Sequence, residues 1–175
     1  MPLRCLCAPL NDLIQLRAVL GVRSPVHTLA RLLNPCDAPV SIQSIFHPAY
    51  AQLHAAADQL LKQPRALVFK GDSGEIEIKP QADTQLKYLK DGVLQEEIQP
   101  RSINQRVSRV ETPSVKPLVA LWNNREENDY GLNAVLATTA VAIVALDGAP
   151  NLKAAHKLAA DLWRQRDMNR IQLCL

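Results

Sequence analysis

Aromatic residues are scarce in this sequence, with two Trp, three Tyr and two Phe among 175 residues. A protein that stacks single-stranded bases interleaves aromatic with basic side chains. Two places fit that description: Trp163 with Arg164 and Arg166, and Trp122 with Arg125. Because large aromatic side chains are usually buried, we expect both tryptophans in the core or at an interface.

No hydrophobic run is long enough to span a bilayer. The uncharged stretch over residues 130–146 falls short of the roughly 20 apolar residues required. Its alanines favour a buried helix. The first residues contain no apolar segment of the length typical of a secretory signal. We therefore expect a cytoplasmic protein with no membrane partner.

Cysteines are also few, at positions 5, 7, 36 and 174. Cys5 and Cys7 are separated by one residue, which is not the spacing of a zinc knuckle, and no second pair follows. A disulfide framework is not expected in a cytosolic chain of this size. We therefore expect ordinary reduced thiols.

The composition is that of a folded domain, with 47% hydrophobic and 21% charged residues. These values resemble those of soluble globular proteins, which argues against intrinsic disorder. A chain of this length buries enough surface to form a stable core without disulfides or bound metals. We expect residues 1–175 to form a single α/β domain.

The net charge of +3 conceals alternating blocks of charge. Residues 1–70, 101–125 and 151–175 are basic by +4, +4 and +3, whereas residues 71–100 and 126–150 are each acidic by −4. The candidate phosphate contacts in the last two basic blocks are Arg101, Arg106, Arg109, Lys116, Lys153, Lys157, Arg164, Arg166 and Arg170. Such patches bind nucleic acid through counterion release. The alternative is a solvated surface that faces the acidic blocks.

Periodicity predicts mixed helices and strands in the first half of the chain. Apolar spacing favours helices over residues 10–20, from Ser24 as N-cap to Asn34, and over 48–63. Gly21 is a natural helix stop. Alternation over 40–46 indicates a strand, and the apolar run 66–69 indicates a buried parallel strand. Residues 75–78 read as another short strand.

A β-hairpin is the strongest local prediction. Asp91-Gly92 separates two alternating runs, residues 84–90 and 93–98, which is typical of a two-residue turn. Such a turn places Lys87 opposite Glu96. Prolines predict a loop over 99–117, followed by a long buried helix over 128–146. A last helix, capped by Asn151, runs to about Arg166. Strands mixed with helices indicate the α/β class.

Three segments resemble the anthranilate phosphoribosyltransferase family. The first is residues 16–24 with His27-Thr28-Leu29 and Leu32-Leu33-Asn34-Pro35. The second is residues 65–71 with Gly74-Glu75-Ile76-Glu77-Ile78, and the third is residues 130–134. The resemblance covers most of residues 10–165 but only the later half of the family's chain. It implies part of the large α/β domain of the nucleoside-phosphorylase/phosphoribosyltransferase-like class.

The sequence departs from this family at its substrate sites. The family's Gly-Thr-Gly-Gly-Asp loop for diphosphate is missing, and the six glycines are never adjacent. The family's N-terminal helical domain is missing too. Its magnesium-binding Asp-Glu pair aligns with Ile76-Glu77, and its His before Gly aligns with Lys70. We therefore expect no cofactor, with magnesium only if the chain serves a transferase.

The resemblance also supplies candidate site residues. Arg17 falls where the family places an Arg that contacts the acceptor carboxylate, although an Arg at a helix end is often structural. Lys70 and Gly71 follow a buried strand, where ligand loops often lie. Glu77 is a weak metal candidate because magnesium sites usually use several oxygen donors. His47 has no assignable nucleophile, and we expect no catalytic residue.

With these departures, the sequence resembles a subgroup of paralogues of the family, the YbiB type. Members of this subgroup are associated with nucleic-acid binding and form homodimers. We expect a non-catalytic protein that binds single- or double-stranded nucleic acid non-specifically. The alternative is a phosphoribosyl- or glycosyltransferase whose donor site lies in a missing segment. A third reading is a truncated remnant, whose exposed apolar surface would favour dimerisation or aggregation.

Overall fold

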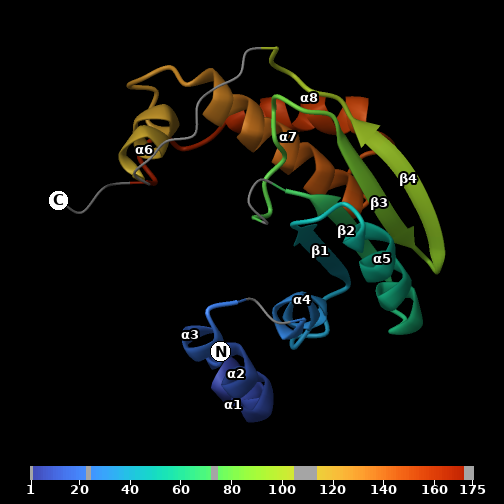
Figure 1. The fold of residues 1–175 in the computed structure, drawn as a ribbon. Coiled ribbons are helices and arrows are strands. Elements are labelled where there is room, and N and C mark those ends of the chain that lie inside the picture. The colour runs from blue at the N-terminus through green and yellow to red at the C-terminus, as the bar shows by residue number, and fades with distance from the viewer. Residues whose placement is uncertain (1, 23–24, 72–74, 105–113, 172–175) are drawn as a thin grey trace.

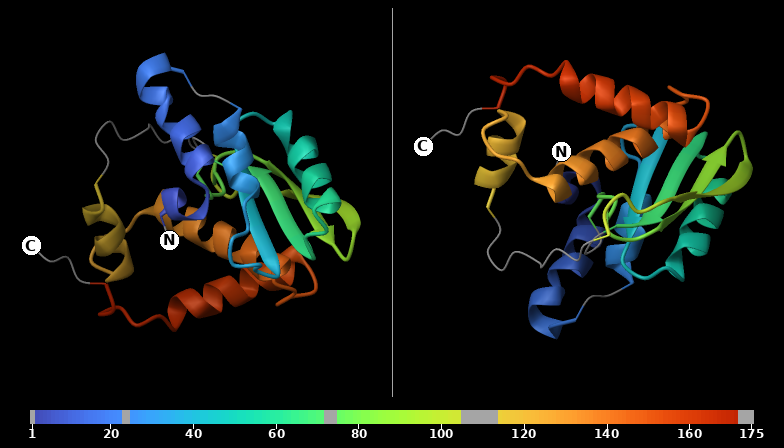
Figure 2. Two further views of the ribbon diagram at one scale, coloured as in Figure 1. Left: turned by 90° about the horizontal axis from the view of Figure 1, so that it is seen from below. Right: turned by 90° about the horizontal axis from the view of Figure 1, so that it is seen from above.

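The computed structural model describes residues 2–22, 25–71, 75–104 and 114–171. Four strands form one sheet in the order β1 (Val40–Ile45), β2 (Arg65–Lys70), β3 (Thr84–Lys90) and β4 (Val93–Gln99). β1 and β2 are parallel, and the other two pairs are antiparallel. Helix α5 (Tyr50–Leu60) lies on one side of the sheet, and α7 (Asp129–Ala145) and α8 (Leu152–Arg164) lie on the other (Figures 1 and 2). The predicted α/β class is confirmed.

The hairpin has the predicted turn and register. Asp91 and Gly92 have φ angles of 50° and 80°, which match the left-handed conformation that a tight two-residue turn requires. Lys87 lies opposite Glu96, and the two side chains form an ion pair. The turn chemistry therefore fixes the register of β3 on β4.

The buried strand β2 carries apolar side chains to both faces of the sheet. Leu67 and Phe69 belong to a core cluster with Ala137 and Val141 of α7. Val68 belongs to a second cluster with Ala51 and Ala55 of α5, and Ala51 is likewise buried. This two-sided burial is typical of a parallel strand covered by helices, as the sequence predicted.

Asparagines begin both C-terminal helices. The Asn128 side chain accepts a hydrogen bond from the Gly131 N–H at 2.8 Å. The Asn151 side chain accepts from the Ala154 N–H at 2.9 Å. Each cap satisfies a backbone donor that the helix itself leaves without a partner. The predicted start of each helix is confirmed. Neither these nor any other helix among the described residues is long and apolar enough to cross a membrane.

The N-terminal segment is a string of short helices: α1 (Leu3–Leu6), α2 (Ala8–Gln15), α3 (Arg17–Leu20), α4 (Val26–Leu29) and the 3₁₀ turn η1 (Ala30–Leu32). The helix predicted over 10–20 is present but is interrupted at Leu16, which divides it into α2 and α3. The Val19 N–H donates to the Leu16 carbonyl at 3.0 Å, a tighter i to i−3 bond that separates α2 from α3. Gly21 ends α3 with φ 68°, as predicted. Ser24, the predicted cap, lies outside the described residues.

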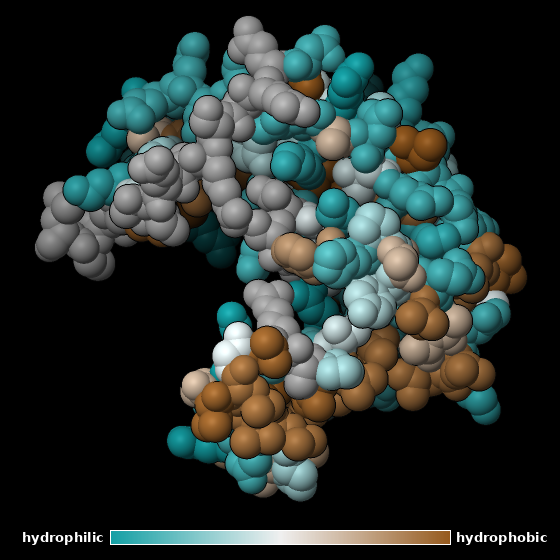
Figure 3. Space-filling view, viewed as in Figure 1, coloured by the Kyte–Doolittle hydropathy of each residue, from teal (hydrophilic) through white to brown (hydrophobic). Residues whose placement is uncertain are grey.

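None of these N-terminal helices contains a buried residue. Helices α1 to α3 extend away from the sheet (Figure 1), whereas η1 contacts β1 and α5. The space-filling view shows apolar side chains gathered on this part of the molecule (Figure 3). Val19 is 82% exposed, so this segment gains little from the core of the described domain.

The predicted strand over 75–78 is wrong. The Glu77 N–H donates to the Glu75 carbonyl at 2.9 Å, and the Ile78 N–H donates to Thr138 Oγ1 of α7 at 3.0 Å. Because the backbone N–H groups of Glu77 and Ile78 already have these partners, the segment does not pair with a neighbouring strand. The predicted loop over 99–117 is too long at both ends, since β4 includes Gln99 and α6 (Lys116–Trp122) begins at Lys116; residues 105–113 lie outside the described ones.

Candidate functional site

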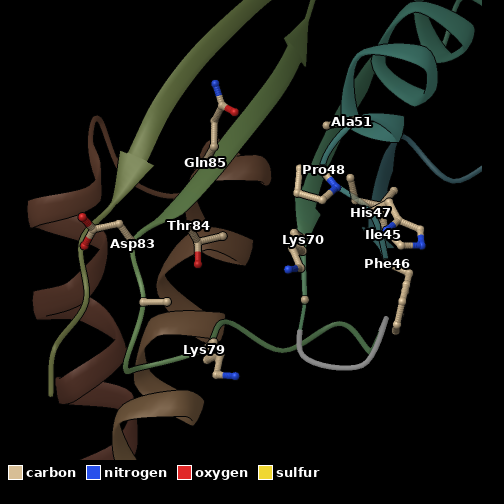
Figure 4. Close-up of a pocket in the computed structure, with 12 residues that line it drawn as sticks. Ile45, Phe46, His47, Pro48, Ala51, Lys70, Lys79, Asp83, Thr84 and Gln85 are labelled. Carbon is tan, nitrogen blue, oxygen red and sulfur yellow. The ribbon is translucent and has the colours of Figure 1, made fainter. Parts of the chain in front are cut away.

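The carboxyl ends of the two parallel strands form the candidate site. Ile45 of β1 pairs with Lys70 of β2, so the chain leaves the sheet at two adjacent points. Such ends are where α/β sheets commonly bind ligands. A pocket of about 570 Å³ opens there, lined by residues 45–48, 51, 70–71, 79 and 82–85 (Figure 4). This volume lies within the range of pockets for small molecules.

Gly71 is required by its surroundings. Its N–H donates to the buried Ser44 Oγ at 3.2 Å. A Cβ at this position would collide with the Glu75 carbonyl oxygen and with Ser44 Oγ. A glycine is therefore the residue that lets the chain turn closely over the end of β1. The ligand loop expected after this strand begins at Lys70 and Gly71, and residues 72–74 lie outside the described ones.

Two lysines give the pocket a basic side. Lys70 lies at the end of β2 and Lys79 lies on the segment before β3 (Figure 4). Asp83 also lines the pocket, and its carboxylate accepts a hydrogen bond from the Arg101 N–H at 2.9 Å. The lining thus carries two basic side chains and one acidic side chain, which has a donor of its own. This favours a ligand with negative charge.

An aromatic group lies at the other side of the pocket. The Phe46 and His47 rings meet edge to face at 4.8 Å between centroids, and Tyr50 lies 6.2 Å from His47. Phe46 is 50% exposed. Exposed aromatic surface beside cations suits a ligand that has both a charged group and an apolar part. His47, for which we expect no catalytic role, lines the pocket.

A buried polar network connects β1 to α5 behind the pocket. The Gln43 amide nitrogen donates to both carboxylate oxygens of Asp58, at 2.8 and 2.9 Å. Its oxygen lies 2.7 Å from His54 Nδ1. Burial raises the pKa of Asp58 to about 6, although the Gln43 hydrogen bond opposes this shift. Burial, together with the charge of Arg31, lowers the pKa of His54.

Arg17 and Glu77, the two residues carried over from the resemblance, lie outside the pocket. Arg17 is exposed at the first position of α3. A Glu77 carboxylate oxygen accepts from the Tyr130 hydroxyl at 3.3 Å. Among the described residues, no group of three His, Cys, Asp or Glu side chains is placed to hold a metal ion. The structure does not bring either residue to Lys70 and Gly71.

The basic candidates divide into different surroundings. Arg101, Lys116 and Arg164 are exposed, and Arg164 forms an ion pair with Asp161 of its own helix. Arg106 and Arg109 lie outside the described residues. The exposed side chains of Arg101 and Lys116 are accessible to phosphates.

Arg166 is held in the packing between α6 and α8. Its guanidinium donates to the backbone carbonyls of Leu121, Trp122 and Trp163, and lies 3.7 Å from the centre of the Trp163 ring. The two tryptophans meet edge to face at 5.6 Å. Both rings thus take part in an interface between helices, where we expected them.

Sequence reasoning missed Lys79 and Asp83 as pocket residues. Both precede β3, and only the antiparallel pairing of β3 with β2 brings them to the pocket that Lys70 lines. It also missed Gln43, His54 and Asp58. Gln43 and Asp58 lie 15 residues apart, a spacing that carries no recognisable signal. A polar residue amid the alternation of β1 was the available hint.

The comparisons with known proteins agree with this architecture. A sequence model of the glycosyl transferase family, a/b domain, matches residues 5–165. The chain belongs to this family. Similar curated proteins are anthranilate phosphoribosyltransferases. That of Paracidovorax citrulli is 30% identical over 168 residues, which cover 89% of this chain and 49% of the relative.

Two further relatives show the same limits of coverage. The anthranilate phosphoribosyltransferase of Delftia acidovorans is 29% identical over 82% of this chain and 44% of its own length. That of Polynucleobacter necessarius is 37% identical over 53% of this chain and 27% of its own length. The chain spans about half or less of the curated relatives it matches, while its resemblance to the family is confirmed.

Proposed function

We propose that this chain is the ligand-binding α/β part of a phosphoribosyltransferase or related glycosyltransferase. Its pocket binds a phosphorylated sugar, and the transfer of that sugar requires a further segment that supplies a diphosphate loop. The chain alone binds the donor and does not turn it over. This reading follows the named activity of the relatives and the family match.

The observation that carries this proposal is the basic pocket at the ends of β1 and β2. Lys70 and Lys79 supply positive charge, and ammonium groups bind phosphates as point charges. Phe46 and His47 supply apolar surface beside them. A phosphorylated donor and an acidic aromatic acceptor both need these two kinds of surface.

A thermal unfolding series tests the proposal. Phosphoribosyl pyrophosphate raises the unfolding temperature, because a ligand at 100 times its Kd stabilises the folded state by about 2.7 kcal/mol. Lys70→Gln reduces this shift, whereas Lys62→Gln, a change of one exposed lysine after α5, leaves it intact. An unchanged unfolding temperature at millimolar donor, with and without magnesium, would contradict the proposal.

A second candidate function is non-specific nucleic-acid binding. Lys153, Lys157 and Arg164 are exposed on α8, and their spacing places them along one side of the helix. Such a stripe could neutralise successive phosphates. The Asp161 carboxylate, which pairs with Arg164, reduces the positive charge that this side of the helix presents to phosphates. This candidate, like the expected homodimer, stays a prediction.

Fluorescence anisotropy with a labelled oligonucleotide tests this second candidate. Binding at low salt falls steeply as salt rises if phosphates are contacted. The double variant Lys153→Gln, Lys157→Gln weakens binding to every sequence alike, whereas Lys62→Gln does not. Flat anisotropy at both salt concentrations removes nucleic acid as a partner of this chain.

A further inference from the structure

The residues near the pocket do not fit the magnesium ion that the resemblance implies. Ile76 stands where the resemblance places one carboxylate, and this hydrocarbon side chain is 52% exposed. The remaining carboxylate, Glu77, accepts a hydrogen bond from Tyr130. No group of three possible ligand side chains occurs anywhere in the described segments. Magnesium is usually held by one or two carboxylates together with waters and substrate phosphates, and positions 76 and 77 offer a single carboxylate that already accepts a hydrogen bond.

The pocket instead places cations where a phosphate would lie. Lys70 and Lys79 line the same cavity from two separate segments, and the Lys70 side chain extends toward the β3 side of the pocket (Figure 4). Where the resemblance places a histidine, the chain has Lys70. Compared with the pattern of the family, the sequence has one carboxylate fewer at position 76 and a lysine in place of a histidine at position 70. An ammonium group neutralises phosphate charge without a metal.

The backbone beneath Lys70 is fixed. Gly71 is buried, its N–H donates to Ser44 Oγ, and the Glu75 carbonyl lies against it. Lys70 itself pairs with Ile45 in the sheet. The base of this side chain is therefore held at the edge of the cavity, while its exposed end remains adjustable. Because the backbone is already fixed, only the end of the Lys70 side chain loses conformational entropy when it binds an anion.

We propose that Lys70 and Lys79 bind a diphosphate or phosphate group of the ligand without magnesium. This inference rests on the proposed function, because it assigns the phosphorylated end of the same ligand to the basic side of the pocket. The cavity of about 570 Å³ exceeds the space that a phosphate alone needs, so the rest of the ligand can extend toward Phe46 and His47. Thr84 and Gln85, which also line the pocket, offer neutral hydrogen-bonding groups.

Calorimetric titration of the whole chain with inorganic pyrophosphate tests this inference. One series contains EDTA and a second contains magnesium. We expect the Kd in EDTA to be the same as, or smaller than, that in magnesium, because magnesium competes for the anion in solution. Lys70→Gln and Lys79→Gln each raise the Kd at least tenfold, and Lys70→Arg restores most of the affinity. Lys62→Gln, which changes an exposed lysine after α5, is the matched control and leaves the Kd unchanged.

Two results would overturn the inference. One is binding that requires added magnesium. The other is an equal effect of Lys62→Gln and Lys70→Gln, which would mean general attraction to surface charge. Circular dichroism of each variant confirms that it is folded, so that lost binding is not lost structure.

Titration with phosphoribosyl pyrophosphate separates this inference from the proposed function. If the donor binds only with magnesium, the proposed function stands and the metal-independent site fails. If pyrophosphate binds in EDTA through Lys70 but the donor does not bind at all, the anion site stands and the proposed function fails. If neither ligand binds, both fail.

Discussion

Asp58→Asn should remove a pH dependence from the stability of this protein. Asp58 is 2% exposed, and its pKa rises from 3.8 to about 6 on burial. One pKa unit corresponds to about 1.36 kcal/mol, so the ionised carboxylate lowers the free energy of unfolding by about 3 kcal/mol at high pH. The hydrogen bonds from Gln43 are already included in that shift.

The sign follows from linkage. A folded-state pKa above the unfolded value contributes stability at low pH that is lost as the pH rises through the folded pKa. With values of 3.8 and about 6, the loss from Asp58 between pH 5 and pH 7.5 is about 1.4 kcal/mol. His54, whose lowered pKa favours the neutral imidazole, has the opposite effect in the lower part of this range. Only the difference between Asp58→Asn and the parent protein isolates the carboxylate.

Urea denaturation of both proteins at pH 5 and pH 7.5 measures this difference. The parent protein should lose about 1.4 kcal/mol more than Asp58→Asn over this interval. Asp12→Asn, which removes an exposed carboxylate of α2, is the matched control and should behave like the parent protein. If the free energy of unfolding changes with pH by the same amount in Asp58→Asn and in the parent protein, the pKa of Asp58 is not raised in the folded state. The description of the buried network is then wrong.

Three other changes probe the fold and the site. Gly71→Ala should lower the free energy of unfolding by about 1–3 kcal/mol in urea denaturation, because its Cβ meets the Glu75 backbone; an unchanged midpoint would refute the close approach. Asn151→Ala should lower the free energy of unfolding by about 1 kcal/mol in the same measurement. Asn151→Asp should leave it unchanged, because the carboxylate can still accept the Ala154 N–H. Arg166→Lys should lose the hydrogen bonds to the carbonyls of α6 and α8 and shift the tryptophan fluorescence maximum; an identical spectrum would show that the guanidinium does not hold Trp163 in place.

The homodimer expected from the resemblance remains to be measured. The exposed apolar side chains of the N-terminal helices, such as Val19, are consistent with association in solution. Light scattering coupled to size exclusion gives the mass directly. A clean monomer over a wide concentration range would contradict this expectation.

Local patterns were sufficient where one short segment determines its own structure. The Asp91-Gly92 turn set the register of Lys87 on Glu96, because a two-residue loop leaves no freedom to slip. Asn128 and Asn151 marked helix starts since a side chain three residues away satisfies an exposed donor. The apolar run of β2 was long enough to indicate burial on both faces.

Local patterns failed where a distant residue decided the outcome. Residues 75–78 alternate like a strand, but Thr138 of α7 takes the Ile78 N–H and the segment stays irregular. Arg166 reads as a basic surface residue, yet the carbonyls at the end of α6 and the ring of Trp163 surround it. In each case the competing partner lies more than 40 residues away or is presented by another helix.

The sequence by itself determined the α/β class, the family and the buried strand that ends at Lys70, just before Gly71. These features rest on periodicity, turn chemistry and local motifs, which depend on residues near one another in the chain. Only the tertiary structure brought Lys79 and Asp83 to Lys70, and only it buried Asp58 against Gln43. The pairing of strands and the packing of α5 on the sheet decide which side chains share a cavity or lose their water, and charge and pKa respond to that neighbourhood.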